Sequence, residues 1–458
     1  MRTILKKIVT TINRLQPTQI MVLGFASIIV IGAILLNLPI STQSGESIGF
    51  LDALFTATSA VCVTGLVVVD TATYWSMFGQ IIIIGLIQIG GLGFMTATTL
   101  FALLIRKKIN LRERLLIQES LNQGDLSGLV KLTRYVILMT LTVEGIGAIL
   151  LSTVFIPQFG LTRGIWYSIF HAISAFCNAG FDLMGSVSGP FSSLTYYVNN
   201  FTITMTISGL IILGGIGFPV MLDIVKMKKF SKFNLHSKVV LITTVILISI
   251  GMLFMITVEF NNPATLGNLN IGGKLLASFF QSVTARTAGF NTIDLGLMHQ
   301  ASIFIMIILM FIGASPASTG GGIKTTTLAT LILAVRSFVY NKSDIEVFGR
   351  RVESSTVRKS LGIFVLGISV VVVGTLIISL SEPHFNLVEV GFEVVSAIAT
   401  VGLSIGGSPS LSTIGKIFIM IFMFMGRVGA LTILMAISSK GIKKNPTIRY
   451  PEGKIIVG

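Results

Sequence analysis

The sequence has few charged residues and very few cysteines and histidines. Only 11% of its 458 residues are Asp, Glu, Lys or Arg, against about 25% in an ordinary soluble domain, which excludes a soluble globular fold. Two cysteines imply no disulfide framework, and four histidines without a His/Cys cluster at ligand spacing do not indicate a metalloenzyme. The sequence contains no recognisable arrangement of residues for a catalytic nucleophile, a metal site or a phosphate-binding site. We therefore do not expect the chain to be an enzyme.

Long apolar runs take the place of these charges. Hydrophobic residues make up 52% of the chain, and many runs reach the roughly 20 residues that a helix needs to cross a bilayer. The first run lacks a small-residue cleavage site and exceeds a secretory h-region, so we interpret it as a retained span. We predict an all-α integral membrane protein with eight spans: Ile20–Leu38, Trp75–Ile105, Tyr135–Phe155, Thr195–Val225, Val239–Val258, Ser302–Val335, Leu361–Leu380 and Leu411–Ile437.

A shorter, semi-apolar segment lies between the two spans of each pair. Each has room for about 10–14 helical residues, which is too short to cross a bilayer but suits a re-entrant helix. The predicted architecture is therefore four pseudo-repeats of span, re-entrant pore helix, filter loop and span around a central pore. The divisions are a cytoplasmic N-terminus (1–19), repeat 1 with a cytoplasmic linker (20–134), repeat 2 (135–238), repeat 3 (239–359), repeat 4 (360–439) and a cytoplasmic tail (440–458).

The charges are distributed unequally between the two sides of this arrangement. Five segments on one side carry 27 of the 33 Lys and Arg residues: Met1–Ile20, Arg106–Arg134, Lys226–Lys238, Arg336–Lys359 and Lys440–Gly458. By the positive-inside rule, that side is cytoplasmic. We therefore predict a protein of the cell membrane with both termini in the cytoplasm. A basic surface against lipid headgroups explains the net charge of +15 without nucleic acid.

Acidic residues prevail on the opposite side. An acidic outer vestibule would concentrate cations, although ordinary solvation of loops explains the same residues equally well. The nine carboxylates are Glu46, Asp52, Asp70, Asp182, Glu259, Asp294, Glu382, Glu389 and Glu393.

Four related motifs follow the short helices. They read "SAVCVTGL", "SAFCNAGF", "VTARTAGF" and "SAIATVGL", and their glycines are Gly65, Gly180, Gly289 and Gly402. A helix that ends within the membrane directs its partly negative C-terminus toward the centre, which favours a cation there. Carbonyl oxygens of the following residues can then replace the hydration shell of the ion, and glycine permits backbone conformations that a Cβ would obstruct.

We predict a potassium filter made of backbone carbonyls from these loops. The loops contain no ring of acidic side chains, which favours potassium over calcium, whereas potassium over sodium is less certain from the residues alone. The predicted filter residues are Val63, Thr64 and Gly65; Asn178, Ala179 and Gly180; Thr287, Ala288 and Gly289; and Thr400, Val401 and Gly402.

The run Ser302–Val335 contains a polar interruption, Gly313–Thr327, which we call the intramembrane segment. It resembles a phosphate loop, but Ile323 separates Gly322 from Lys324 and the flanks are membrane helices, so that interpretation fails. A non-helical segment at this depth must be buried in protein or line water. We predict a gate below the filter, with a static kink as the alternative; its residues are Gly313, Ala314, Ser315, Pro316, Ala317, Ser318, Thr319, Gly320, Gly321, Gly322 and Lys324.

Three further ionisable residues lie at membrane depth, where charges are costly and usually functional. Arg286 is expected to support the filter by pairing with carboxylates or loop carbonyls behind it. Arg427 is expected in the cavity below the filter, as an electrostatic barrier or as a partner of the intramembrane segment. Glu144 is a third buried charge without an assigned partner. A disulfide between Cys62 and Cys177 is improbable, because filter side chains should point away from one another around the axis.

The four half-repeats, the glycines ending "VTG", "NAG", "TAG" and "TVG", and the interrupted third-repeat helix resemble the Trk/Ktr/HKT superfamily of potassium transporters. The compact chain and the tail "IRYPEGKIIVG" look most like the bacterial Ktr membrane subunit. In that family each loop glycine belongs to the filter, and a serine in the first loop accompanies sodium preference. Gly65 stands there in this chain, so the resemblance implies potassium selectivity. It also supports the partnership of Arg427 with the intramembrane segment.

The resemblance implies partners as well. They are a second copy in a homodimer, with one pore per subunit, and a separate cytoplasmic ring of nucleotide-binding regulatory subunits of the RCK type. Basic cytoplasmic segments could dock that ring or simply face lipid headgroups. No covalent cofactor is expected; potassium is the transported ligand, and sodium is a candidate activator. The alternative is a sodium-dependent secondary transporter with alternating access, although four parallel repeats suit a central pore better.

Overall fold

The structure is a computed structural model that describes residues 17–93, 129–342, 344–429 and 432. In this part of the chain the fold is helical apart from one two-stranded hairpin. The first half contains α2 (Pro17–Leu36), η1 (Pro39–Ser41), α3 (Phe50–Cys62), α4 (Thr71–Tyr74), α5 (Met77–Leu92), α8 (Leu129–Phe159), α9 (Leu161–Phe176), α10 (Gly185–Ser188), η2 (Thr195–Tyr197), α11 (Phe201–Ile216), α12 (Phe218–Met227) and η3 (Phe230–Lys232).

The second half repeats the same order of long, short and medium helices. It contains α13 (Leu235–Glu259), α14 (Ile271–Thr284), η4 (Leu295–Leu297), α15 (Gln300–Ile312), α16 (Thr325–Val339), β1 (Glu346–Val347), β2 (Arg350–Arg351), α17 (Ser354–Ser381), α18 (Leu387–Ile398), η5 (Ser408–Ser410) and α19 (Thr413–Val428).

Among the described residues, four helices are long and apolar enough to span a membrane, namely α2, α8, α13 and α17. They are the first helix of each predicted repeat. Apolar side chains on α8 and α17 are exposed, among them Leu138, Leu141, Val365 and Leu376. Exposed leucines and valines along a helix of this length are what a bilayer-facing surface requires.

The medium helix of each repeat, which follows the short helix, is shorter than the span predicted there. Helices α5, α11, α15 and α19 have 16, 16, 13 and 16 residues and end before Gly93, Gly217, Gly313 and Gly429, respectively. These glycines have φ values of 82°, 94°, 65° and 92°, a conformation that L-residues avoid and that stops a helix. In repeat 2, α11 and α12 are bent by 98° at this break.

The span predicted over Thr195–Val225 is therefore broken in the structure, where its two helices pass as an apolar pair. The hydropathy pattern continues through Gly217, while the backbone turns there. In the third repeat the interruption was expected, but the helix resumes at Thr325 instead of after Thr327. The later parts of the predicted spans Trp75–Ile105 and Leu411–Ile437 fall largely outside the described residues, as do the predicted cytoplasmic termini.

The short helices α3, α9, α14 and α18 are the predicted pore helices. Each packs against the long helix before it, α2, α8, α13 and α17 respectively. Each also contacts a medium helix of the preceding repeat: α5 contacts α9, α11 contacts α14, α15 contacts α18, and α19 contacts α3. The last of these contacts joins repeat 4 to repeat 1, so the four units form a closed ring.

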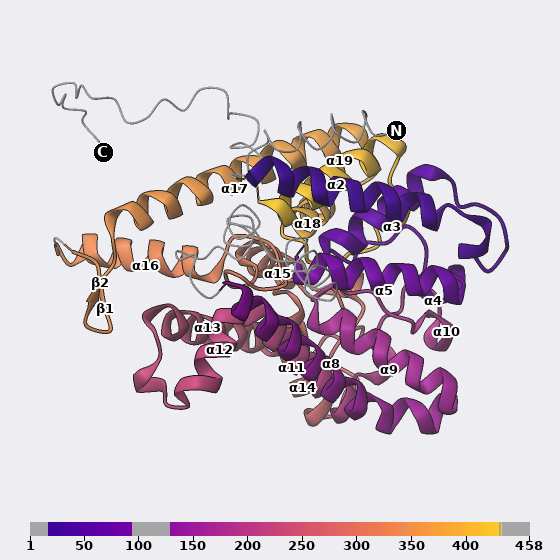
Figure 1. The fold of residues 1–458 in the computed structure, drawn as a ribbon, viewed down its shortest axis with the longest axis horizontal. Helices are drawn as coiled ribbons and strands as arrows, with labels where there is room; N and C mark the ends of the chain where they lie inside the picture. The colour runs from indigo at the N-terminus through magenta and orange to yellow at the C-terminus, as the bar shows by residue number, and fades with distance from the viewer. Residues whose placement is uncertain (1–16, 94–128, 343, 430–431, 433–458) are drawn as a thin grey trace.

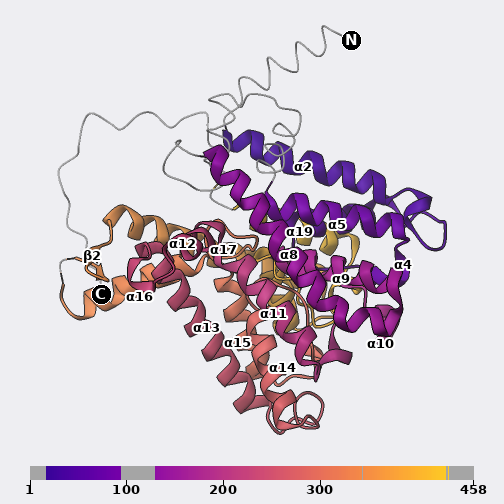
Figure 2. The same ribbon diagram turned by 60° about the horizontal axis from the view of Figure 1, so that its bottom comes forward.

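The two ends of the molecule differ. Figures 1 and 2 show α4 and α10 together at one end and the β1–β2 hairpin with α16 at the opposite end. Side-chain caps fix the starts of several helices: Asn386 and Glu389 form a capping box on α18, and Asn270 accepts a hydrogen bond from Gly273 N on α14. The loops after the pore helices lie between these two ends.

Candidate ion pathway

Each pore helix is followed by a three-residue loop of repeating conformation. We number these loops by repeat: loop 1 (63–65), loop 2 (178–180), loop 3 (287–289) and loop 4 (400–402). In each loop the first residue and the glycine have positive φ, while the residue between them does not. The φ values are 57° and 93° in loop 1, 59° and 69° in loop 2, 71° and 84° in loop 3, and 51° and 87° in loop 4. Positive φ is unfavourable for a branched residue such as Val63, so the surrounding structure imposes the shared conformation.

The four glycines form a closed ring. A Cβ added to Gly65 would lie 2.5 Å from the carbonyl oxygen of Ala179, and one on Gly180 would lie 2.7 Å from that of Ala288. The circle continues from Gly289 to the carbonyl oxygen of Val401 (2.7 Å) and from Gly402 to that of Thr64 (2.0 Å). Each glycine thus abuts the middle carbonyl of the next loop, and no larger residue fits at any of the four places.

Hydrogen bonds from the pore helices hold the loops in place. Thr64 N, Ala179 N and Val401 N each donate over 2.8 Å to the carbonyl oxygen of a serine five residues earlier, which is Ser59, Ser174 or Ser396. The Ser59 and Ser396 hydroxyls also accept from the N–H of the loop glycine. In loop 3, Thr284 takes this place, and its hydroxyl donates to Phe290 O. Our sequence interpretation missed these supports, although each belongs to the quoted motifs.

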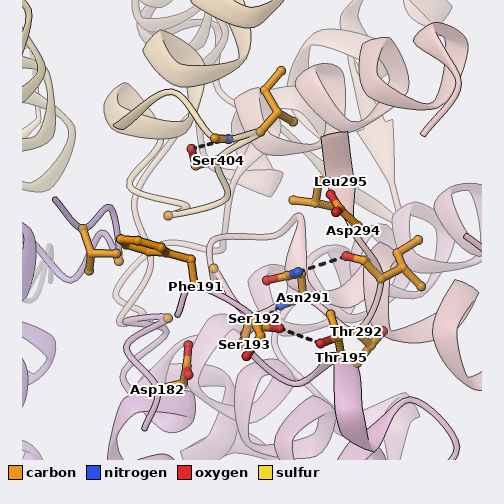
Figure 3. A pocket seen from close by; sticks show the side chains of 18 of the residues that line it. Asp182, Phe191, Ser192, Ser193, Thr195, Asn291, Thr292, Asp294, Leu295 and Ser404 are labelled. Carbon is orange, nitrogen blue, oxygen red and sulfur yellow. Dashed lines mark hydrogen bonds between the residues drawn. The ribbon is translucent and has the colours of Figure 1, made fainter. Parts of the chain in front are cut away.

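On one side the ring opens into a cavity of about 810 Å³, whose lining includes Gly65, Gly180, Gly289 and Gly402. Three carboxylates from the linkers also line it, those of Asp70, Asp182 and Asp294, and no Lys or Arg is among its described lining residues. Figure 3 shows Asp182 and Asp294 at this cavity. Burial raises the pKa of Asp182 to about 7, and the nearby Asp70 carboxylate adds a smaller increase. A hydrogen bond from Met184 N acts in the opposite direction and lowers this pKa. We call this cavity the acidic mouth, because three of the nine predicted carboxylates line it.

Five of the six remaining acidic residues of that side have other partners. Asp52 forms an ion pair with Lys416 at 2.6 Å, which ties α3 to α19. Glu259 accepts hydrogen bonds from Asn262, Thr265 and His299 N. Glu382 accepts from Ser412, Glu393 accepts from Ser404 and Ser408, and Glu389 caps α18. The acidic mouth therefore comes from only part of the predicted set.

On the other side of the ring the intramembrane segment packs into the break between α11 and α12. Ser315 N donates to Gly215 O (3.0 Å), Thr319 N donates to Gly214 O (3.2 Å), and Phe218 N donates to Ala317 O (3.0 Å). These bonds satisfy backbone groups that the ends of the two helices leave free. The intramembrane segment of repeat 3 is thus bound in the break between the two helices of repeat 2.

The segment also touches three of the four loops. The Thr319 hydroxyl lies 3.4 Å from Asn178 Oδ1 in loop 2. A Cβ on Gly320 would lie 2.0 Å from Thr287 Oγ1, and one on Gly321 would lie 2.3 Å from Thr400 Oγ1. The segment is therefore directly against the first residues of loops 2, 3 and 4, at the depth where the sequence placed it.

Arg427 joins the segment to the opposite side of the ring. Its Nη1 donates to Thr319 O, and its Nη2 donates to Gly90 O and Gly91 O at the end of α5. A guanidinium suits this place because helix ends expose free, partly negative carbonyls. Lys324 instead folds back on the segment, with Nζ donating to Gly320 O at 2.6 Å. The predicted partnership of Arg427 with the segment is present in the structure.

Comparison with known proteins identifies the family to which this chain belongs. The family model TrkH, described as "Cation transport protein", matches residues 6–444 of the chain. The chain belongs to this family. Its members are transport proteins rather than enzymes, which confirms both the expectation of a non-enzyme and the resemblance to Trk/Ktr proteins.

Relatives of similar length are known. The chain is 43% identical to "Ktr system potassium uptake protein B" of Bacillus subtilis over 97% of each protein, and 43% identical to "Potassium/sodium uptake protein NtpJ" of Enterococcus hirae over the full length of both. The crystal structure of the potassium transporter TrkH from Vibrio parahaemolyticus matches with a TM-score of 0.72 at 18% identity, over 91% of this chain and 84% of that one. At that identity the structural match shows the fold alone.

Arg286 lies behind loop 3 and is 5% exposed. Its Nη2 donates to Thr244 Oγ1 on α13 at 3.3 Å. No carboxylate forms an ion pair with it among the described residues, and no loop carbonyl accepts from its guanidinium there. Within the described residues, a hydroxyl of the long helix accepts from this guanidinium instead of the predicted carboxylates or loop carbonyls.

Two other buried groups have partners that sequence could not supply. Gln88 Nε2 donates to Glu144 Oε2 at 3.2 Å, and Cys177 Sγ lies 3.8 Å from Glu144 Oε1. Cys62 and Cys177 are both free and fully buried. The absence of a disulfide between them agrees with the expectation from their places in loops 1 and 2.

Proposed function

We propose that this protein takes up potassium through the pathway that runs from the acidic cavity past the ring of four glycines. The closed ring of loop carbonyls is the observation that carries the proposal, because a ring of backbone oxygens can replace the hydration shell of a monovalent cation. Relatives named as potassium uptake proteins in Bacillus subtilis and Vibrio alginolyticus support the choice of ion.

Selectivity against sodium is part of the proposal. All four loops end in glycine, including loop 1, and none of the filter residues carries a carboxylate. The printed name of the Enterococcus hirae relative includes sodium, so sodium is the ion to compare. Purified protein in liposomes should pass potassium and rubidium much faster than sodium. Equal sodium flux would contradict a selective ring.

The intramembrane segment is proposed to be the gate of this pathway. It lies against loops 2, 3 and 4, and Arg427 connects it to α5. Residues with little side-chain bulk allow it to rearrange. The alternative is a static kink, and removal of Ala314–Thr319 separates the two because a kink controls no flux.

The proposed setting is the cell membrane, with both termini cytoplasmic and the protein a homodimer. A cytoplasmic ring of nucleotide-binding subunits is the proposed regulator, supported by the relatives' names as parts of a Ktr system and by the basic residues near the β1–β2 hairpin. Sodium is a proposed activator. Co-purification with the candidate ring, with and without nucleotide, tests this assembly.

A sodium-coupled transporter with alternating access is the second candidate. Breaks between α11 and α12 and between α15 and α16 favour it, because discontinuous helices are frequent in such transporters. Flux measurement with imposed gradients decides between the two. Potassium flux that proceeds without sodium supports the pore, whereas strict coupling to a sodium gradient supports the transporter.

A further inference from the structure

Glu144 is a carboxylate in the middle of α8 that the proposed pathway does not use. It is 5% exposed, and no Lys or Arg forms an ion pair with it among the described residues. A buried carboxylate at membrane depth is costly and is kept where it has a role. Its partners are Gln88 of α5, at 3.2 Å, and the thiol of Cys177, at 3.8 Å.

Cys177 connects this carboxylate to the contact surface of the intramembrane segment. It comes immediately before loop 2, between Phe176 and Asn178. The Thr319 hydroxyl donates to Phe176 O at 3.2 Å and lies 3.4 Å from Asn178 Oδ1. The residues on both sides of Cys177 therefore contact the segment, while the thiol itself lies 3.8 Å from both Glu144 Oε1 and Gln88 Oε1.

Gln88 connects Glu144 to the same segment by a second route. It lies on α5 three residues before Gly91, and the carbonyls of Gly90 and Gly91 accept hydrogen bonds from Arg427. Arg427 in turn donates to Thr319 O. The routes are also linked to each other, because a Cβ on Gly91 would lie 2.6 Å from Cys177 Sγ.

We propose that Glu144 is a positioning residue for the intramembrane segment. It accepts from Gln88 and Cys177 at once, and so it fixes the two surfaces, loop 2 and the end of α5, between which Thr319 is held. This inference rests on the proposed function of the segment as a gate. A carboxyl group serves here because its two oxygens offer acceptor sites for two donors.

Replacement by alanine should loosen both surfaces. Glu144→Ala leaves the part-buried amide of Gln88 without its acceptor, which is unfavourable, and removes one of the two oxygens that lie 3.8 Å from the Cys177 thiol. Glu144→Gln keeps an acceptor oxygen and should behave much more like the original protein. The effect should be local to loop 2, because Arg427, and no carboxylate, is the charged group near Cys62, the corresponding residue of repeat 1, among the described residues.

The two native cysteines provide the test. In Cys62→Ser protein only Cys177 can react with a small membrane-permeant maleimide, and in Cys177→Ser protein only Cys62 can. Glu144→Ala should speed labelling of Cys177 by about tenfold and leave the rate for Cys62 unchanged. Glu144→Gln should leave both slow. Equal acceleration of both cysteines would mean general loosening, and no acceleration would mean that Glu144 fixes nothing; either result overturns the proposal.

A flux measurement completes the test. Glu144→Ala should raise basal potassium flux into liposomes, and it should have no further effect in protein that lacks residues 314–319. Thr142→Ala, an exposed change on the same helix, is the matched control. An equal increase without the segment would overturn the inference. A protein without any potassium flux would instead contradict the proposed function, while the labelling rates would still report on Glu144.

Discussion

Arg427 Nη1 donates a hydrogen bond to the carbonyl oxygen of Thr319, and through this contact α19 of repeat 4 holds the intramembrane segment of repeat 3. The same guanidinium binds the end of α5 in repeat 1. One side chain thus links three repeats directly beneath the loops. Its planar group with several fixed donors is suited to binding carbonyls in two directions.

Loss of this bridge should open the pathway. Arg427→Ala is expected to raise basal potassium flux about tenfold or more, because charge-assisted hydrogen bonds to both the segment and α5 are removed. Arg427→Lys should restore only part of the control, since an ammonium is a compact point charge without the fork geometry. Liposome flux provides the measurement, with Arg351→Ala in the exposed hairpin as the control. A fall in flux would show that Arg427 does not restrain the segment.

Gly402→Asp should abolish uptake or remove its ion preference. An added Cβ would lie 2.0 Å from Thr64 O, and φ is 87°, so the carbonyl ring cannot keep its shape. Gly45→Ala is the matched control, because Gly45 also has a positive φ but nothing lies within 4 Å of an added Cβ. The ratio of potassium to sodium flux is the quantity to compare. An unchanged ratio in the Gly402 variant would refute the filter assignment.

Deletion of Ala314–Thr319 should raise basal flux and leave ion preference unchanged. The deletion removes the Thr319 contacts with loop 2 and Arg427, while the glycines that form the ring remain. Flux and ion ratio are measured on the same liposomes. Unchanged flux would favour the static kink, and a changed ion ratio would show that the segment also shapes the ring.

External pH should affect uptake at low potassium concentration. The pKa of Asp182 is raised to about 7, so its carboxyl group becomes neutral as pH falls through that value and becomes charged as pH rises. The acidic cavity then attracts cations less strongly at low pH. Initial uptake should therefore decrease between about pH 8 and pH 6. Asp182→Asn should have lower uptake at high pH and a flatter profile; an unchanged profile would exclude Asp182 as the source.

Several parts of this molecule could be read directly from the sequence. The four motifs at regular spacing located the loops, because glycine is required wherever neighbouring backbones approach as closely as Gly65 and Ala179 do. The polar composition of Gly313–Thr327 marked a non-helical segment among apolar helices, and Arg427 stood out as a charge at membrane depth. In each case the residue type, whether glycine, a polar residue or a charged one, does not suit an ordinary apolar membrane helix.

Other parts depend on contacts that no local pattern contains. The break at Gly217 lies in an apolar run, so hydropathy continues through it although φ is 94°. The acceptor of Arg286 is Thr244, an ordinary residue of a long helix. Gln88 and Glu144 are 56 residues apart and meet only because α5 and α8 pack at the boundary of two repeats. Such partners follow from tertiary packing, which sequence periodicity does not encode.

The ring of loops is built from one polypeptide, and this allows its four sides to differ chemically. A ring made from four identical chains would carry any obstruction or any charge in fourfold copies. Here Thr319 and Arg427 each occur once, on one side of the axis, and Asn178 stands where the other loops have Val63, Thr287 and Thr400. A chain of four divergent repeats can therefore place a single intramembrane segment beneath a nearly symmetric ring, without four copies of that segment.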